Sequence, residues 1–139
     1  MRPQCTDTKG TAMRTITTVE MNPDSREEYL PGYTPQFPHI ASHIDGRLYQ
    51  SDVAPWHWHE SVELFYVRRG SILYRTPHAE HVVHAGCGGM VNSNILHTTK
   101  ILDPSLDMAL HLFSPSLVAG VAGGTVEQRY IRPLTADAG

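Results

Sequence analysis

Three histidines and one glutamate in this chain have the residue types and the spacing of a transition-metal site. His57 and His59 are separated by a single residue. Side chains alternate between the two faces of an extended strand, so these two imidazoles point to the same side. Glu63 follows on the next expected strand, and His97 stands further along the chain. Three imidazole nitrogens and one carboxylate oxygen suit Zn, Ni, Mn or Fe better than Ca or Mg. The four residues therefore predict a site for a divalent transition metal.

A second interpretation of the same residues stays open, in which they line an effector pocket that holds no metal. A buried imidazole or carboxylate without a partner is costly, so such a pocket has to satisfy these groups in another way. Phe65 shares the inward face of Glu63 if the strand is regular, and it gives the pocket an apolar wall. The expected ligand-binding residues are His57, His59, Glu63, Phe65 and His97.

Four residues beside the cluster are expected to have structural roles. Trp56 and Trp58 point away from the histidines on a regular strand, so they pack against the other sheet layer or the N-terminal arm, with a dimer surface as the alternative. Asn92 and Asn94 are expected to form a turn rather than to bind an effector.

Short strands separated by turn signals are predicted to position the cluster. Asp45-Gly46, Arg69-Gly70 and Asp103-Pro104 are among the signals. The expected strands are residues 37–44, 47–50, 55–58, 62–67, 71–75, 80–84, 89–92, 96–101 and 107–113. Many short strands at close spacing are typical of an all-β sandwich or barrel.

Two further elements are predicted near the C-terminal end. Residues 114–120 indicate one short helical turn, because Ser114 is a natural N-cap, Pro115 suits a first turn and Gly120 ends a helix. Residues 126–133 are predicted to form a last strand, and no amphipathic helix of ten or more residues is expected.

Composition divides the chain into four segments. Residues 1–12 are polar and lack hydrophobic periodicity, so we expect a disordered leader or an expression remnant. Residues 13–36 contain several prolines and form an irregular N-terminal arm that is able to cover a sheet. Residues 37–134 form the main domain, and residues 135–139 resemble the start of a linker.

Charge and cysteine content exclude several classes of protein. The 139 residues include 11 Lys and Arg against 14 Asp and Glu, which gives a net charge of -3 and no basic excess for binding a nucleic-acid backbone. Cys5 and Cys87 form no metal-binding or disulfide pattern. No segment has the pattern of a signal peptide or a membrane span. We therefore expect a cytoplasmic protein that does not bind a membrane.

Two motifs in the chain resemble those of the cupin superfamily. The first runs from His57 to Gly70 as H-x-H, three residues, E, six residues, G, and the second places Gly86, Asn92 and Asn94 ahead of His97. The resemblance implies an all-β double-stranded β-helix, a jelly-roll barrel, whose metal-facing positions are the predicted four. The chain departs from the superfamily pattern at four positions. Ser51 stands where a glycine is usual, and Cys87 stands where an aspartate is usual. Asn92 and Asn94 stand where a proline and a glycine are usual.

Four segments of the chain are similar to the ligand-sensing N-terminal domain of AraC-type transcriptional regulators. They are residues 56–60, 85–89, 91–97 and 128–133. The resemblance covers about residues 37–134. It implies a domain that binds a small-molecule effector such as a sugar and forms a homodimer. DNA binding in that family belongs to a C-terminal pair of helix-turn-helix motifs, which this chain does not contain.

Three functions are compatible with the sequence. The first is the sensing and dimerisation domain of an AraC-type regulator, which is not an enzyme. The second is a stand-alone metal-dependent cupin enzyme of the dioxygenase or isomerase type, and the third is a non-catalytic metal-binding module. The resemblance favours the first, because the sequence names no substrate-orienting group beyond the cluster.

Overall fold

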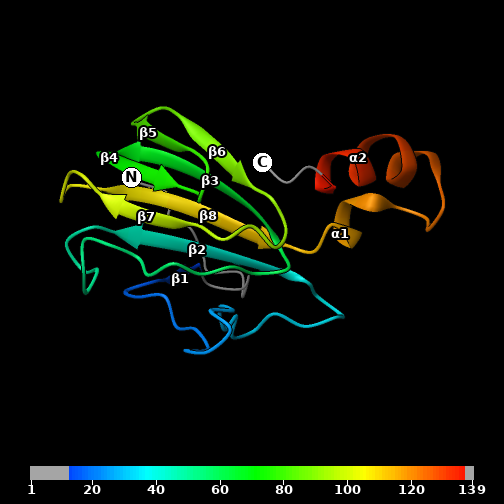
Figure 1. Ribbon diagram of the computed structural model, residues 1–139, viewed down its shortest axis with the longest axis horizontal. Helices are drawn as coiled ribbons and strands as arrows, with labels where there is room; N and C mark the ends of the chain where they lie inside the picture. Colours follow the sequence, from blue (N-terminus) through cyan, green and yellow to red (C-terminus); the bar gives the residue numbers. More distant parts are fainter. Residues whose placement is uncertain (1–12, 137–139) are drawn as a thin grey trace, which may run out of the picture.

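Two β-sheets face one another in the computed structural model, which describes residues 13–136 (Figure 1). The five-stranded sheet has the order β1-β2-β8-β3-β6, and the three-stranded sheet has the order β5-β4-β7. In chain order the strands are β1 Arg14–Thr15, β2 His39–Asp45, β3 Val62–Arg69, β4 Ser71–Arg75, β5 Glu80–His84, β6 Gly88–Val91, β7 Thr98–Ile101 and β8 Asp107–Phe113. Apart from the parallel pair β1 and β2, the neighbouring strands are antiparallel.

The core lies between the two sheets because each long strand alternates apolar and polar residues. In β8 the side chains of Met108, Leu110 and Leu112 are buried, and the residues between them face outward. Val67 on β3 and Ile72 on β4 pack against them from the two sheets. This alternation fixes the register, since a slip by one residue would expose the apolar set.

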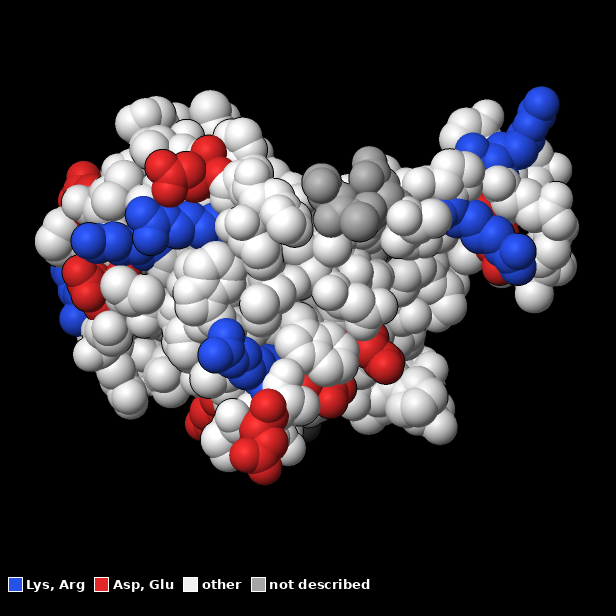
Figure 2. All heavy atoms as spheres, viewed as in Figure 1, with Lys and Arg blue, Asp and Glu red and all other residues white. Residues whose placement is uncertain are grey.

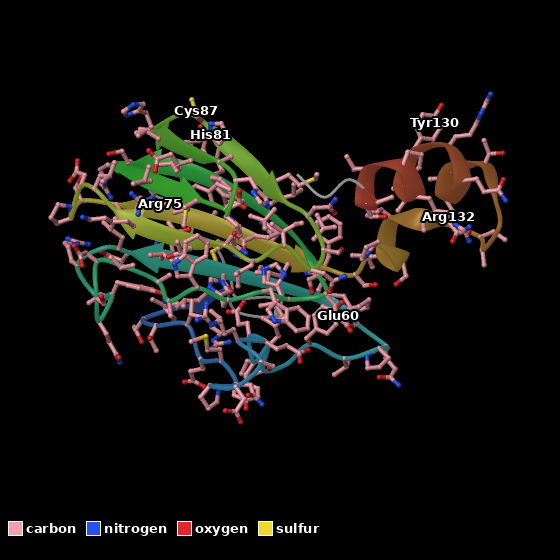
Figure 3. The ribbon with its side chains drawn as sticks, viewed as in Figure 1. Glu60, Arg75, His81, Cys87, Tyr130 and Arg132 are labelled. Atoms are coloured by element: carbon pink, nitrogen blue, oxygen red, sulfur yellow. The ribbon has the colours of Figure 1, made fainter. Side chains whose placement is uncertain are left out.

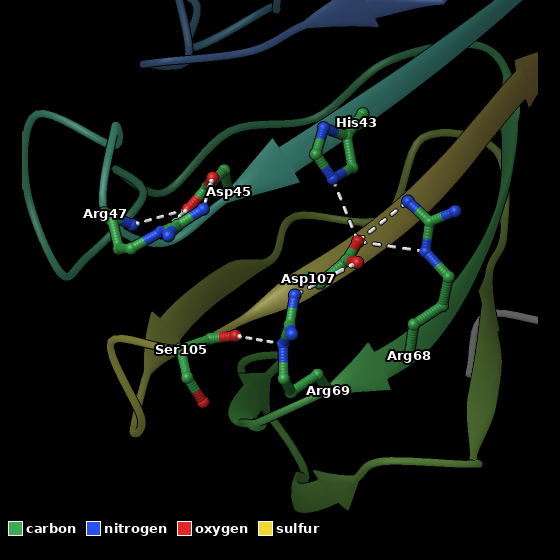
Figure 4. Close-up of polar contacts among 7 residues, drawn as sticks. All are labelled: His43, Asp45, Arg47, Arg68, Arg69, Ser105 and Asp107. Carbon is green, nitrogen blue, oxygen red and sulfur yellow. Dashed lines mark hydrogen bonds and ion pairs between the residues drawn. The ribbon is translucent and has the colours of Figure 1, made fainter.

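Charged side chains add a second constraint on three neighbouring strands (Figure 4). The carboxylate of Asp107 on β8 lies 2.9 Å from Nε2 of His43 on β2 and 2.7 Å from a guanidinium nitrogen of Arg68 on β3. Desolvation acts to raise the pKa of Asp107, but the hydrogen bonds from His43 and Arg68 outweigh it and lower that pKa. The carboxylate therefore stays ionised and links β2, β8 and β3.

The residues of the N-terminal arm pack along the edge of the larger sheet next to β2 (Figure 1). Met21 and Glu28 form an antiparallel bridge, so residues 20–29 make a small hairpin. Glu27 forms a parallel bridge with Trp58, which ties this hairpin to the segment between His57 and His59.

The structure confirms most of the predicted strands and corrects two of them. Residues 37–44, 62–67, 71–75, 80–84, 89–92, 96–101 and 107–113 correspond to β2 through β8. Residues 47–50 and 55–58 were predicted as strands but form turns and isolated bridges, among them His57 opposite His97. Pro55 and several turn residues interrupt this stretch, so it meets its neighbours only at single positions.

The prediction of a last strand over residues 126–133 is wrong, because the chain is helical there. The short helix α1 spans Ser116–Ala119, as expected, but a π-helical segment at Glu127–Ile131 continues into α2 at Arg132–Thr135. The helical run covers residues 125–135, and none of its side chains is buried. Pro133 has no N–H to donate, which favours the wider π turn before it, and Glu127 pairs with Arg132 five residues on.

These helices project from one end of the barrel, where Tyr130 and Arg132 lie far from the sheets (Figure 3). None of the helices in the described residues is long and apolar enough to cross a membrane.

Basic and acidic side chains are mixed on the surface. In the face shown in Figure 2, Lys and Arg side chains lie beside Asp and Glu side chains. One ion pair of this kind joins Arg75 and Glu80, with Nε and Oε2 3.1 Å apart. The described residues on this face thus agree with the sequence, which has no excess of basic residues. Cys87 is exposed at the upper edge of the barrel in Figure 3, and Cys5 lies outside the described residues.

Truncating a core valine tests this packing. Val67→Ala should lower the free energy of unfolding by about 2 kcal/mol, because its side chain is fully buried between the sheets and the smaller residue leaves a cavity. The matched control is Val82→Ala on β5, whose side chain is 49% exposed and whose loss should cost less than about 0.5 kcal/mol. Urea unfolding measures both, and equal losses would contradict the assignment of the core.

Candidate metal and ligand site

Three of the predicted ligands meet inside the barrel. His57 and His97 lie directly opposite each other and exchange two backbone hydrogen bonds of 3.0 and 2.9 Å, which brings their ring centroids to 4.3 Å. His59 stands beside them, with its centroid 5.2 Å from that of His97. One nitrogen from each ring lies within 4.8 Å of the other two, and all three residues are buried. Segments 40 residues apart in the sequence thus supply one cluster of imidazoles.

Backbone carbonyls fix the tautomer of every imidazole in the cluster. Each ring places its Nδ1 at hydrogen-bond distance from a carbonyl oxygen two residues away, so Nδ1 carries the proton and donates it. The carbonyls belong to Pro55 (2.7 Å, to His57), Ser61 (2.9 Å, to His59) and Ile95 (2.8 Å, to His97). The Nε2 atoms then present lone pairs to the centre of the cluster, and Nε2 of His59 is buried without a hydrogen-bond partner.

Glu63 on β3 approaches the cluster at His59. Its Oε2 lies 3.4 Å from Nε2 of His59, and the residue is 7% exposed. Burial acts to raise the pKa of Glu63, but the neighbouring histidines, His59 first, outweigh burial and lower it. The site therefore has an ionised carboxylate beside three imidazoles, which is a donor set that suits a divalent transition metal.

Glu28 is a second carboxylate at the site that the sequence analysis missed. Its Oε2 lies 3.9 Å from Nε2 of His57, and its side chain is only 10% exposed. Burial, reinforced by the charge of Glu63, raises the pKa of Glu28 to about 7 although the charges of His59 and Arg14 act against it. The residue belongs to the N-terminal arm, and no spacing motif in the sequence links it to the histidines. Only the pairing of the arm with Trp58 brings it there.

Burial also sets the charge state of the imidazoles. It lowers the pKa of His57 and lowers that of His97 to about 4, so both rings are neutral at neutral pH and free to ligate a metal. For His59 burial acts in the same direction, but the carboxylates of Glu63 and Glu28 outweigh it and raise the pKa. His59 is therefore the histidine of the cluster at which a positive charge, carried by a proton or by a metal ion, is most favourable.

A cavity of about 40 Å³ lies beside the cluster. His57, His97 and both carboxylates line its polar side, and apolar residues of the barrel and the arm line the rest. This volume accommodates an ion with one or two waters. Pockets for organic ligands are about 300–1,000 Å³, so the cavity is far too small for a sugar in this arrangement.

Phe65 is buried as predicted, but it does not line this cavity. Its ring packs in the hydrophobic core, with its centroid 6.0 Å from that of Tyr74, and it fills the space above Gly89. A Cβ atom on Gly89 would lie 2.6 Å from the ring, so glycine is required for this packing. The structure therefore brings together four of the five predicted ligand-binding residues and places the fifth in the core.

Trp58 and Asn94 beside the cluster have the expected structural roles, whereas Asn92 makes a contact that the sequence did not predict. Trp58 turns away from the histidines, and its indole N–H donates a 2.7 Å hydrogen bond to the carbonyl of Ser25 in the arm. Asn94 has a positive φ of 63° in the turn at residues 93–94, and its N–H donates a tertiary hydrogen bond of 2.8 Å to the carbonyl of His59. Asn92 binds the C-terminal helix through a 2.8 Å hydrogen bond to the carbonyl of Leu134.

Comparison with known proteins identifies the type of domain. Residues 39–135 match the family described as the AraC-like ligand binding domain. A search of curated proteins finds no match.

Among solved structures, similar chains include a cupin-2 domain protein from Shewanella frigidimarina (14% identity, TM-score 0.43) and an RmlC-like cupin from the same organism (20%, 0.44). These alignments cover 52% and 56% of this chain and 66% and 67% of those chains. An HTH_3 family transcriptional regulator from Vibrio cholerae aligns at 13% identity with a TM-score of 0.47, over 62% of this chain and 48% of the regulator. The chain thus spans about two thirds of the two cupins and half of the regulator. The family match and the two-sheet architecture agree with the predicted cupin jelly roll.

The low pKa of His97 has a measurable effect on the metal-free protein. The unfolded chain protonates this histidine near pH 6.5, whereas the folded chain does so only near pH 4. Its contribution to stability is therefore present above pH 6.5 and is lost as the pH falls toward 4, by about 3 kcal/mol. Urea unfolding of the wild type and His97→Gln should show the wild type losing more stability than the variant between pH 7 and pH 4.5. Parallel pH profiles would contradict a neutral, buried His97.

Proposed function

This chain belongs to the AraC-like ligand-binding domain family, and we propose that it is a sensing domain whose barrel holds a divalent transition metal at the three histidines and Glu63. Zn, Ni, Mn and Fe all suit this set of nitrogen and oxygen donors. When bound, the ion would act as a Lewis acid that polarises an oxygen of a ligand beside it. The role of this chain is to bind and report a ligand, with no catalytic residue assigned.

The single observation that carries the metal proposal is the fixed orientation of the three imidazoles. Each Nδ1 donates to a backbone carbonyl, as metal-ligating histidines do with their second nitrogen, and this leaves each Nε2 as an acceptor that faces the centre. A merely polar pocket lining would pair these Nε2 atoms with protein donors. Nε2 of His59 has none among the described residues.

An organic effector such as a sugar requires rearrangement of the arm. The cavity beside the cluster is about 40 Å³, and Ile16 and Val19 of the arm form part of its wall. An effector of several carbon atoms would have to displace these residues, so its binding changes the position of the arm. Such a displacement is what a sensing domain needs in order to transmit occupancy.

The family match favours a sensor over a stand-alone cupin enzyme. The volume of the cavity does not separate the two, because an organic substrate and an organic effector alike would have to displace the arm. A non-catalytic metal-binding module remains the second candidate, and it differs from the sensor in needing no movement of the arm.

The partners follow from the family and are part of the proposal. We expect a homodimer in the cytoplasm that regulates transcription, with DNA bound only through a helix-turn-helix domain outside this chain. The mixed surface charge and the net charge of -3 favour a DNA-binding surface elsewhere.

Metal titration tests the proposal. Untagged protein should bind one Co²⁺ or Zn²⁺ per chain by calorimetry, and the ion should raise the melting temperature because only the folded state binds it. His57→Ala and His97→Ala should abolish both effects, whereas His78→Ala, which changes an exposed histidine outside the cluster, should leave them intact. Unchanged metal content in the two cluster variants would place the ion elsewhere, and no binding by the wild type would end the metal proposal.

A further inference from the structure

We propose that a groove between the N-terminal arm and β2 is a second ligand site, outside the barrel, which binds a small aromatic carboxylate through the guanidinium of Arg14. The groove has a volume of about 250 Å³, and Arg14, Phe37, residues 31–32 and residues 39–41 line it. This volume lies just below the range of about 300–1,000 Å³ for organic ligands, whereas the cavity beside the histidines is about 40 Å³. None of the lining residues is a proposed metal ligand, so the inference goes beyond the proposed function and is independent of it.

The groove lies where β1 leaves part of the edge of β2 uncovered (Figure 1). β1 pairs with residues 42–43 of β2, and no other described strand pairs with residues 39–41 on that side. Along β2 the side chain of Ile40 is buried in the barrel, whereas those of His39 and Ala41 alternate with it and face outward. The groove therefore meets side chains of both faces of the sheet at an open edge.

Backbone hydrogen bonds fix the wall that the arm supplies. The N–H of Tyr33 donates to the carbonyl of Leu30 at 3.2 Å, and Gly32 between them has a φ of 85°, as at the third position of a type II turn. The N–H of Phe37 donates to the carbonyl of Thr34 at 3.1 Å. The groove is thus formed before any ligand arrives, which lowers the cost of binding.

Charge determines which end of a ligand the groove accepts. Arg14 is the one charged side chain among the described residues that line the groove, because burial and the nearby His111 lower the pKa of His39 and keep that imidazole neutral. No ion pair or hydrogen bond joins the Arg14 side chain to another described residue. A guanidinium presents two parallel N–H groups that match the two oxygens of a carboxylate. An anionic group of this shape is therefore the partner that Arg14 lacks.

The rest of the lining favours an aromatic body on the ligand. Pro31, Ile40 and Ala41 are apolar, and the ring of Phe37 is 53% exposed although it is a large hydrophobic side chain. An aromatic ring packs well against such an exposed ring and removes it from water. A ligand in this place contacts the arm and β2 together, so its binding should stabilise the arm on the edge of the sheet.

Benzoate is the probe for this site, and benzamide, which has nearly the same shape without the charge, is its matched control. Titration of the full, EDTA-treated chain should shift the amide NMR signals of residues 39–41 and Gly32 saturably, with benzoate bound at least about tenfold more tightly than benzamide. Arg14→Gln should weaken benzoate binding by about tenfold or more and leave benzamide binding unchanged. Arg14→Lys should give an intermediate benzoate affinity, because an ammonium keeps the charge but loses the paired hydrogen bonds. Arg129→Gln, which changes an exposed arginine of the C-terminal helical run, should match the wild type.

The ratio of the two affinities within one variant keeps the test valid even if a substitution lowers stability. Equal affinities of the wild type for benzoate and benzamide, or an equal loss of both in Arg14→Gln, would overturn the role of Arg14. The site itself is overturned if no amide of the groove shifts saturably, as expected if polypeptide of this chain or of a second copy covers it. Because the protein is free of metal in these titrations, their failure leaves the proposed metal site untouched.

Discussion

The hydrogen bonds from the imidazole Nδ1 atoms to backbone carbonyls are the interaction on which the site depends. They require the residues two positions away to hold their carbonyls in place, and those residues lie in the irregular stretches 55–61 and 95–97 rather than in ladder strands. The antiparallel pair of His57 and His97 and the turn at Asn94 hold these stretches against each other. The two sheets thus serve as a rigid frame for a site built on their connections.

Burial then determines what the oriented side chains can do. In water the imidazoles would titrate near neutral pH and the carboxylates well below it, but desolvation lowers the pKa of His57 and His97 and raises that of Glu28. Each shift favours the neutral form of the isolated group. The cluster as a whole still needs positive charge beside Glu63, and His59 or a metal provides it. Proton and metal therefore compete for the same place.

Sequence reasoning identified the fold and most of the cluster because both leave local patterns. The H-x-H spacing placed His57 and His59 on one side even though the stretch forms only isolated bridges, since side-chain alternation needs an extended backbone and not a ladder. The side chain of Phe65 points inward, as the alternation of side chains along the strand predicts. This alternation does not tell which inward residues border a cavity and which fill the core. Glu28 depends on tertiary pairing between distant segments. In residues 125–135 the side chains of Val126, Tyr130 and Leu134 recur every four positions, which is a helical spacing that the prediction of a strand overlooked.

The position of the N-terminal arm connects the closure of the barrel with the contacts of the histidine cluster. Residues of the arm wall off the cavity, contribute Glu28 to its polar side and pair with Trp58, so the arm closes the barrel and contacts the cluster through the same few residues. A ligand larger than the cavity has to compete with these contacts, so its binding free energy includes the cost of moving the arm. A ligand that fits the cavity changes the stability of the arm only by the contacts that it makes with the residues of the arm.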